Sequence, residues 1–273
     1  MGVSPLDLIL FLGMAFSKKK TLCAFCPESA NLTGEHLFAD WIDKILTKAT
    51  THYTFHEIDS ATLEYRKWSR RHLDRKAKVV CGDCNNTWMS DIDNAARNTL
   101  KDVIRYRAPV SFLPSGVESI AAFAMKNALV ADYTYTSPFF TSNQRGQFKK
   151  SRKFPPGTYI WFGAVAPDRV SRHGICSTLY GKPNVDASNS IETYVFTWAA
   201  ESLLLQLVAA RWTNILTLSR SGPPELWQDA PLNDVFVPFW PAAPSHVAWP
   251  PARYVSHKDL HAIAERFKFI RFV

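Results

Sequence analysis

The sequence predicts an α+β protein, with a zinc-binding N-terminal part followed by an α+β region that has a small antiparallel sheet and apolar helices. Three observations support this fold class. Four cysteines form two Cys-x-x-Cys pairs, several segments carry apolar residues at helical spacing, and others are rich in β-branched and aromatic residues. The 273 residues, 47% of them hydrophobic, are enough to bury one large core or two modest ones.

Residues 1–17 are expected to be an N-terminal extension. The apolar run Leu8–Leu12 has no basic stretch before it and is too short to cross a bilayer, so it predicts neither a signal peptide nor an anchor. Because Met14 is a natural start, residues 1–13 are interpreted as an over-long gene start or a loose apolar extension.

The strongest motif is the pair of cysteine knuckles. Each two-residue gap forms a tight turn that directs both sulfurs inward, so the two pairs can supply four thiolates to one structural zinc ion. The predicted ligands are Cys23, Cys26, Cys81 and Cys84. Free thiolates persist in reducing compartments, which favours a cytoplasmic protein. The fifth cysteine, Cys176, is expected to be a small buried apolar residue.

Polar residues follow both knuckles. Glu35 and His36 come soon after the first pair, and Asn85 directly follows the second. If zinc joins the knuckles, these three side chains converge. A histidine suits deprotonation of water near neutral pH, and the oxygen donors of Glu35 and Asn85 suit Mg²⁺ or Mn²⁺. The pattern therefore predicts a second, catalytic metal site; the alternative is a zinc knuckle that only folds a loop or grips nucleic acid.

The segments CAFC, GEH and VVCGDCNNTWM resemble the HNH endonuclease family, the ββα-metal or His-Me finger nucleases. They also resemble a bacterial subgroup in which this module precedes a longer α+β region. The resemblance implies a nuclease module over residues 18–116. In that module Glu35 and Asn85 would be ligands of the catalytic divalent ion, and His36 would be the general base. The four cysteines would hold a structural zinc.

Three positions differ from the family pattern. Lys76 stands where the family has its middle asparagine, which fixes the loop carrying the base. Asn85 stands where many members have histidine. Trp88 replaces a lysine that often contacts phosphate, so in this chain the phosphate contact must come from elsewhere.

A basic run precedes the second knuckle. The net charge of +8 makes a polyanion a reasonable partner, because basic surfaces attract phosphate backbones. The run predicts a nucleic-acid-binding ribbon, with duplex DNA as the expected partner; a solvated basic face is the alternative. Its members are Arg66, Lys67, Arg70, Arg71, Arg75, Lys76 and Lys78.

The elements are predicted in order along the chain. Helices are expected over residues 37–48, 85–103, 118–132 and 199–212, with a last helix from Ser256, its N-cap, to about residue 267. Strands are expected over residues 51–58, 79–80, 159–165 and 191–198. Residues 137–157 predict a basic loop, and the proline-rich tail predicts edge strands and coil. The C-terminal region, residues 117–273, shows no catalytic pattern and is interpreted as a substrate- or partner-binding region.

We therefore expect a metal-dependent endonuclease that hydrolyses phosphodiester bonds in DNA, without a membrane partner. Restriction and phage defence are among the contexts in which such modules serve. Two alternatives stay open: a non-catalytic zinc module that binds nucleic acid or protein, and an HNH-type nuclease acting on RNA. The residues do not decide whether the chain forms a homodimer.

Overall fold

The computed structural model describes residues 21–26, 31–46, 53–58, 65–70, 73, 75–106, 109–135, 137–166, 172–181, 191–212, 235–241, 247–256, 259–260 and 263. The predicted N-terminal extension over residues 1–17 lies outside them, as do Arg71 and most of the predicted last helix. At the start of that helix, the amide of Asp259 donates to Ser256 Oγ at 3.3 Å, as an N-cap would require.

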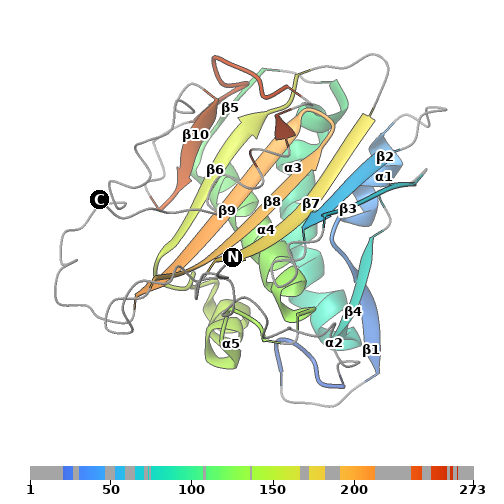
Figure 1. Cartoon of the computed structure of the whole chain (residues 1–273), viewed down its shortest axis with the longest axis vertical. Helices are drawn as coiled ribbons and strands as arrows, with labels where there is room; N and C mark the ends of the chain where they lie inside the picture. The colour runs from blue at the N-terminus through green and yellow to red at the C-terminus, as the bar shows by residue number, and fades with distance from the viewer. Residues whose placement is uncertain are drawn as a thin grey trace, which may run out of the picture.

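A seven-stranded sheet organises the chain (Figure 1). Its order is β10-β6-β9-β8-β7-β2-β3, and all neighbours are antiparallel except β2 and β7. The prediction of a small sheet in the C-terminal region is therefore wrong in size. Two strands of the observed sheet, β2 and β3, come from the N-terminal part. The bounds are β2 Tyr53–Ile58, β3 Tyr65–Arg70, β6 Thr158–Ala164, β7 Arg172–Gly181, β8 Ile191–Ala200, β9 Leu203–Trp212 and β10 Phe236–Trp240.

The helix predicted over residues 199–212 is wrong, because most of that segment is β9. A tight turn with Glu201 at φ 52° joins β8 to β9, and the two strands pair from Ala200↔Leu203 to Ile191↔Trp212. Leu203 and Leu205 pack into the main core, whereas Leu204 packs into a second cluster on the opposite face. A strand buried on both faces has no apolar–polar alternation, so its sequence resembles that of a buried helix.

Two helices cover one face of this sheet (Figure 1). These are α3, Ser90–Tyr106, and α4, Pro114–Tyr133. The Tyr194 hydroxyl of β8 donates to the Ala128 carbonyl of α4 at 3.0 Å, and the Phe123 and Trp198 rings meet edge to face at 5.6 Å. Both helices were predicted in place, although α4 begins earlier than expected because Pro114 opens it.

On the opposite face, the described residues of the C-terminal segment pack against the sheet. Leu260 and Ile263 pack with Ala199 and Leu204, and Gln206 Nε2 donates to the Ile263 carbonyl at 2.9 Å. The predicted edge strands in the tail are confirmed: β10 lies at the sheet edge, and β11, Val247–Trp249, pairs with β5, Val110–Phe112.

The cysteine knuckles flank a separate two-stranded antiparallel sheet, which is called the hairpin below although its two strands are not consecutive in the chain. Strand β1, Leu32–His36, pairs antiparallel with β4, Lys76–Cys81. A short helix, α2 (Gly82–Cys84), and the wide turn η2 (Asn85–Met89) lead from β4 into α3, with a kink at Thr87. The helix predicted over residues 37–48 is shorter than expected: α1 spans Asp40–Ile45.

The loop predicted over residues 137–157 is also wrong in part, because it contains α5, Ser142–Ser151. A capping box starts this helix: the Gln144 amide donates to Thr141 Oγ1 at 3.2 Å, and the Thr141 amide donates to Gln144 Oε1 at 2.8 Å. These bonds satisfy two groups that a helix start leaves free. The helix ends at Arg152 in the left-handed conformation, with φ 57°.

One continuous core joins the two predicted regions. It runs from the first knuckle through α3 and α4 to the strands β8 and β9. The indole Nε1 of Trp198 in β8 donates to the Leu37 carbonyl beside β1 at 2.9 Å, across 161 positions of sequence. The boundary expected between residues 116 and 117 stays a prediction, and the core is packed across it.

Candidate functional site

The four predicted zinc ligands lie together. All four Sγ atoms of Cys23, Cys26, Cys81 and Cys84 are within 4.8 Å of one another. The separations are 3.8 Å for Cys23–Cys84, 3.9 Å for Cys26–Cys84 and 3.5 Å for Cys26–Cys81. Zinc–sulfur bonds of about 2.3 Å in a tetrahedron place the sulfurs about 3.8 Å apart. The four cysteines can therefore hold a zinc ion.

Backbone bonds hold the first knuckle against the second. The amide of Ala24 donates to the Val79 carbonyl of β4 at 2.9 Å, and the amides of Phe25 and Cys81 point at the sulfur of Cys23 at 3.5 and 3.4 Å. Amides directed at a ligand sulfur orient it and reduce its negative charge. The knuckle is thus positioned by the hairpin.

The C-terminal region holds the same knuckle from the other side. Arg145 of α5 is buried, and its Nε donates to the Ala24 carbonyl at 2.9 Å, while its guanidinium lies 3.6 Å from Asp132. The carboxylate of Asp132 accepts from the amides of Phe139 and Phe140 at 2.7 and 3.0 Å. Burial raises the pKa of Asp132 to about 6, an increase that these amides and Arg145 limit.

Trp88 fills the position where the family pattern has a lysine. Its ring packs edge to face on Phe25 and Phe148, with centroids 4.9 and 6.1 Å away. The guanidinium of Arg152, at the end of α5, lies over this ring, 4.7 Å from the centroid. A cation is thus brought to this position from another part of the chain. Burial lowers the pKa of Lys149, but the nearby sulfurs of Cys84, Cys26 and Cys81 outweigh burial and raise it.

The hairpin register separates Glu35 from its neighbour His36. Successive side chains of a strand point to opposite faces, and Glu35 is buried opposite Ala77, whereas His36 is half-buried opposite the exposed Lys76. The stem of Lys76 lies over Gly34, where an added Cβ would meet it at 3.4 Å. Burial, and then the charge of Lys76, lower the pKa of His36 below its usual 6.5.

Glu35 holds a lysine on the inner face of the hairpin. Lys126 of α4 donates from Nζ to Glu35 Oε1 at 2.6 Å and to Asp93 Oδ1 of α3 at 2.7 Å. Burial raises the pKa of Glu35, and the Lys126 charge opposes this rise. For Lys126 burial lowers the pKa, but Asp93 and Glu35 outweigh burial and raise it. The three groups form a largely buried ion-pair cluster.

Asn85 contacts a different residue of the same strand. Its side-chain amide donates from Nδ2 to Thr33 Oγ1 at 3.0 Å, and Thr33 in turn donates to the Val80 carbonyl at 3.2 Å. These bonds fasten the start of the long helical segment to the hairpin. Within the described structure, Glu35 is therefore placed with Asp93 and Lys126, and Asn85 with Thr33.

The arrangement does not fit a divalent ion shared by Glu35 and Asn85. A Mg²⁺ or Mn²⁺ ion needs free oxygen ligands, and Glu35 Oε1 is already 2.6 Å from an ammonium group. The residues that resemble metal ligands would have to release their present partners first. The ion-binding roles of Glu35 and Asn85 stay predictions.

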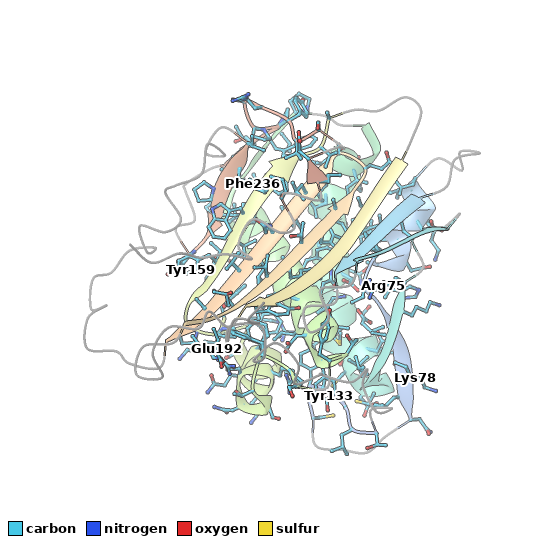
Figure 2. All side chains as sticks on the ribbon, viewed as in Figure 1. Arg75, Lys78, Tyr133, Tyr159, Glu192 and Phe236 are labelled. Atoms are coloured by element: carbon cyan, nitrogen blue, oxygen red, sulfur yellow. The ribbon has the colours of Figure 1, made fainter. Side chains whose placement is uncertain are left out.

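The basic run does not form one continuous strand. Arg66, Lys67 and Arg70 belong to β3, the edge strand of the large sheet, whereas Lys76 and Lys78 belong to β4 of the hairpin and are exposed. Figure 2 shows Arg75 and Lys78 along β4. Charged residues on an edge strand also discourage pairing with other sheets, so β3 has a structural reason for its charge.

Sequence reasoning missed the cluster partners Lys126 and Asp93, and also Arg145. Lys126 and Asp93 fall in predicted helices without a role, and Arg145 falls in the predicted basic loop, for which a nucleic-acid contact, a lid and a solvated loop were open. The available signal was a single lysine in the apolar run AAFAMKNALVA of α4. A charged residue flanked by buried apolar neighbours is almost never fully buried without a partner, so Lys126 predicts an acidic one.

A scan against protein-family models and searches of curated proteins and of solved structures found no match. Among the helices that the structure describes, none combines the length and apolar character needed to span a membrane.

Proposed function

We propose that this chain is a zinc-stapled endonuclease of the HNH type that hydrolyses phosphodiester bonds in DNA, with His36 as the general base. The observation that carries the proposal is the position of His36. It lies half-buried at the end of β1 opposite Lys76, whereas the zinc ligand Cys81 pairs with Leu32 at the other end of the strand. Because the zinc-ligand cluster needs free thiolates, we also propose that the protein acts in the cytoplasm.

The surroundings of His36 support the role of base. A base must be unprotonated to accept a proton, and burial together with the Lys76 charge lowers the pKa of His36 below 6.5. The imidazole is therefore neutral near pH 7. Asp40 and Asp93 act in the opposite direction, as smaller influences that raise its pKa.

The proposed reaction uses this neutral imidazole directly. His36 accepts a proton from a water molecule whose oxygen attacks the phosphorus. The bond from phosphorus to the leaving sugar oxygen breaks, and that oxygen takes a proton from solvent. Lys76 and Lys78 are exposed on the strand opposite and supply positive charge for the phosphate backbone.

One observation favours a second candidate, a zinc module that binds nucleic acid without cleaving it. Glu35 and Asn85, which resemble the ligands of a catalytic ion, are both engaged with protein groups, namely Lys126 and Thr33. If these contacts persist when DNA binds, the site keeps its basic strand but lacks the divalent ion that the family resemblance implies.

The experiment compares cleavage of a supercoiled plasmid, single-stranded DNA and RNA by the zinc-loaded full chain, with Mg²⁺, with Mn²⁺ and without either. The variants are His36→Ala and, as a control, Lys101→Ala, which changes an exposed residue on α3. We expect the wild type and Lys101→Ala to cut DNA, and His36→Ala to lose cutting while it keeps its zinc and its affinity for DNA.

The other outcomes select the alternatives. Cleavage of RNA alone would replace DNA as the substrate. Binding without cleavage under every ion condition, by wild type and variant alike, would establish the non-catalytic module.

A further inference from the structure

The Lys126 cluster is the least expected polar feature of the described structure. Lys126 has no exposed surface, and its ammonium lies 2.6 Å from Glu35 and 2.7 Å from Asp93. Glu35 is 3% exposed, and the side chain of Asp93 is 21% exposed. A buried lysine persists only when paired acids offset the loss of its hydration, and here two acids do so.

The ammonium has no route to solvent along its own helix. Its neighbours Met125, Asn127 and Ala128 are buried like Lys126 itself, and the Phe123 ring lies 5.6 Å from Nζ. Lysines usually extend their charged ends to a nearby surface, which this part of α4 does not offer. Moving the ammonium away would leave buried charges unpaired, so Lys126 is a fixed part of the cluster.

A divalent ion at Glu35 would therefore have to sit beside a fixed ammonium. Two positive groups a few ångströms apart in a buried site repel strongly, because little water screens them. Glu35 and Asp93 each accept a hydrogen bond from Lys126, so the ammonium already occupies one oxygen of each carboxyl group.

We propose that Lys126 is the built-in cation of this site: it occupies the position beneath Glu35 that a divalent ion would otherwise take, and it excludes such an ion from the Glu35–Asp93 pair. The proposal concerns ion binding only, so it stands or falls independently of nuclease activity.

The test measures Mn²⁺ binding to the zinc-loaded full chain by electron paramagnetic resonance and by the shift in thermal midpoint. In the wild type and in Glu35→Gln we expect the same Mn²⁺ binding, with no site lost when the carboxylate is removed. In Lys126→Gln the freed carboxylates should gain one Mn²⁺ per chain and a Mn²⁺-dependent rise in midpoint. Lys126→Gln/Asp93→Asn should lose both gains.

Two results would overturn the proposal. The first is a Mn²⁺ site in the wild type that Glu35→Gln removes, because Lys126 would then not exclude the ion; this comparison needs no change at Lys126 and decides even where Lys126→Gln fails to fold. The second is a folded Lys126→Gln that gains no Mn²⁺. Zinc content and circular dichroism establish that each variant is folded.

Discussion

Replacing Arg145 by methionine should release the first zinc knuckle from the C-terminal region. The Nε of Arg145 donates to the carbonyl of Ala24, which lies between Cys23 and Cys26 in the chain. Methionine keeps the apolar stem of the side chain but removes this bond and the guanidinium. The knuckle would then keep its bonds to β4, the contact of Phe25 with Trp88 and the metal.

The magnitude follows from the contacts that are lost. A hydrogen bond from a charged group contributes about 1.5–3 kcal/mol, and removing one partner of a buried ion pair costs about 3–5 kcal/mol. Because Asp132 loses the guanidinium 3.6 Å away, we expect the unfolding free energy to fall by about 3–5 kcal/mol. The Ala24 bond alone corresponds to zinc release that is about tenfold to a hundredfold faster.

Transfer of zinc to a chromogenic chelator gives the release rate, and denaturant unfolding gives the stability. Lys150→Met is the matched control, because Lys150 is exposed on the same helix, and it should leave both quantities unchanged. If Arg145→Met lost stability but released zinc at the wild-type rate, Arg145 would not restrain the knuckle, and the reasoning from the Ala24 bond would be wrong.

Three further predictions concern His36, the hairpin lysines and α5. The pKa of His36 lies below 6.5, so kcat/KM for cleavage should fall only as the pH drops below 6.5; an acid limb with its midpoint above 6.5 would contradict His36 as the base. Lys76→Ala and Lys78→Ala should each lower the slope of log affinity for DNA against log salt by about one, and Lys101→Ala should not, as measured by fluorescence anisotropy. Thr141→Ala removes the capping box and should cost about 1 kcal/mol in denaturant unfolding, while an unchanged midpoint would show that the cap is dispensable.

The zinc ligands could be predicted because their information is local. A two-residue gap fixes the geometry of each knuckle, whatever the rest of the chain does. Only the contact between the two knuckles joins distant parts of the sequence. A zinc ion with four tetrahedral ligands requires that contact, since each knuckle supplies two of them. The prediction for Cys23, Cys26, Cys81 and Cys84 therefore did not depend on the fold, and the sulfur positions agree with it.

The β9 strand could not be recognised in the same way. Periodicity distinguishes a strand from a helix only when one face is exposed, and both faces of β9 are buried by different parts of the chain. Helix α5 had a readable signal, the pair Thr141 and Gln144, but its surroundings of proline, serine and glycine favoured a loop.

The cluster around Lys126 could not be predicted from the sequence alone. Lys126 lies 91 positions from Glu35 and 33 from Asp93, and no local pattern joins them. The sequence identifies Glu35 and His36 as adjacent polar residues that follow the first knuckle. It does not indicate that a helix from the other half places an ammonium against the first of them.

The long sequence separations in these contacts also bear on how the protein is made. Three hydrogen bonds join residues that are far apart in the chain. They pair Glu35 with Lys126, Ala24 with Arg145 and Leu37 with Trp198, at separations of 91, 121 and 161 positions. Contacts between residues so far apart in the chain raise the contact order and slow folding, because long loops must close before the contacts form. During synthesis the cysteines leave the ribosome long before the residues that fasten them, so a zinc ion captured early would hold a hairpin still lacking most of its support. The cysteine segment is thus not an independent module, because residues of α4 and α5 that are synthesised later complete its contacts.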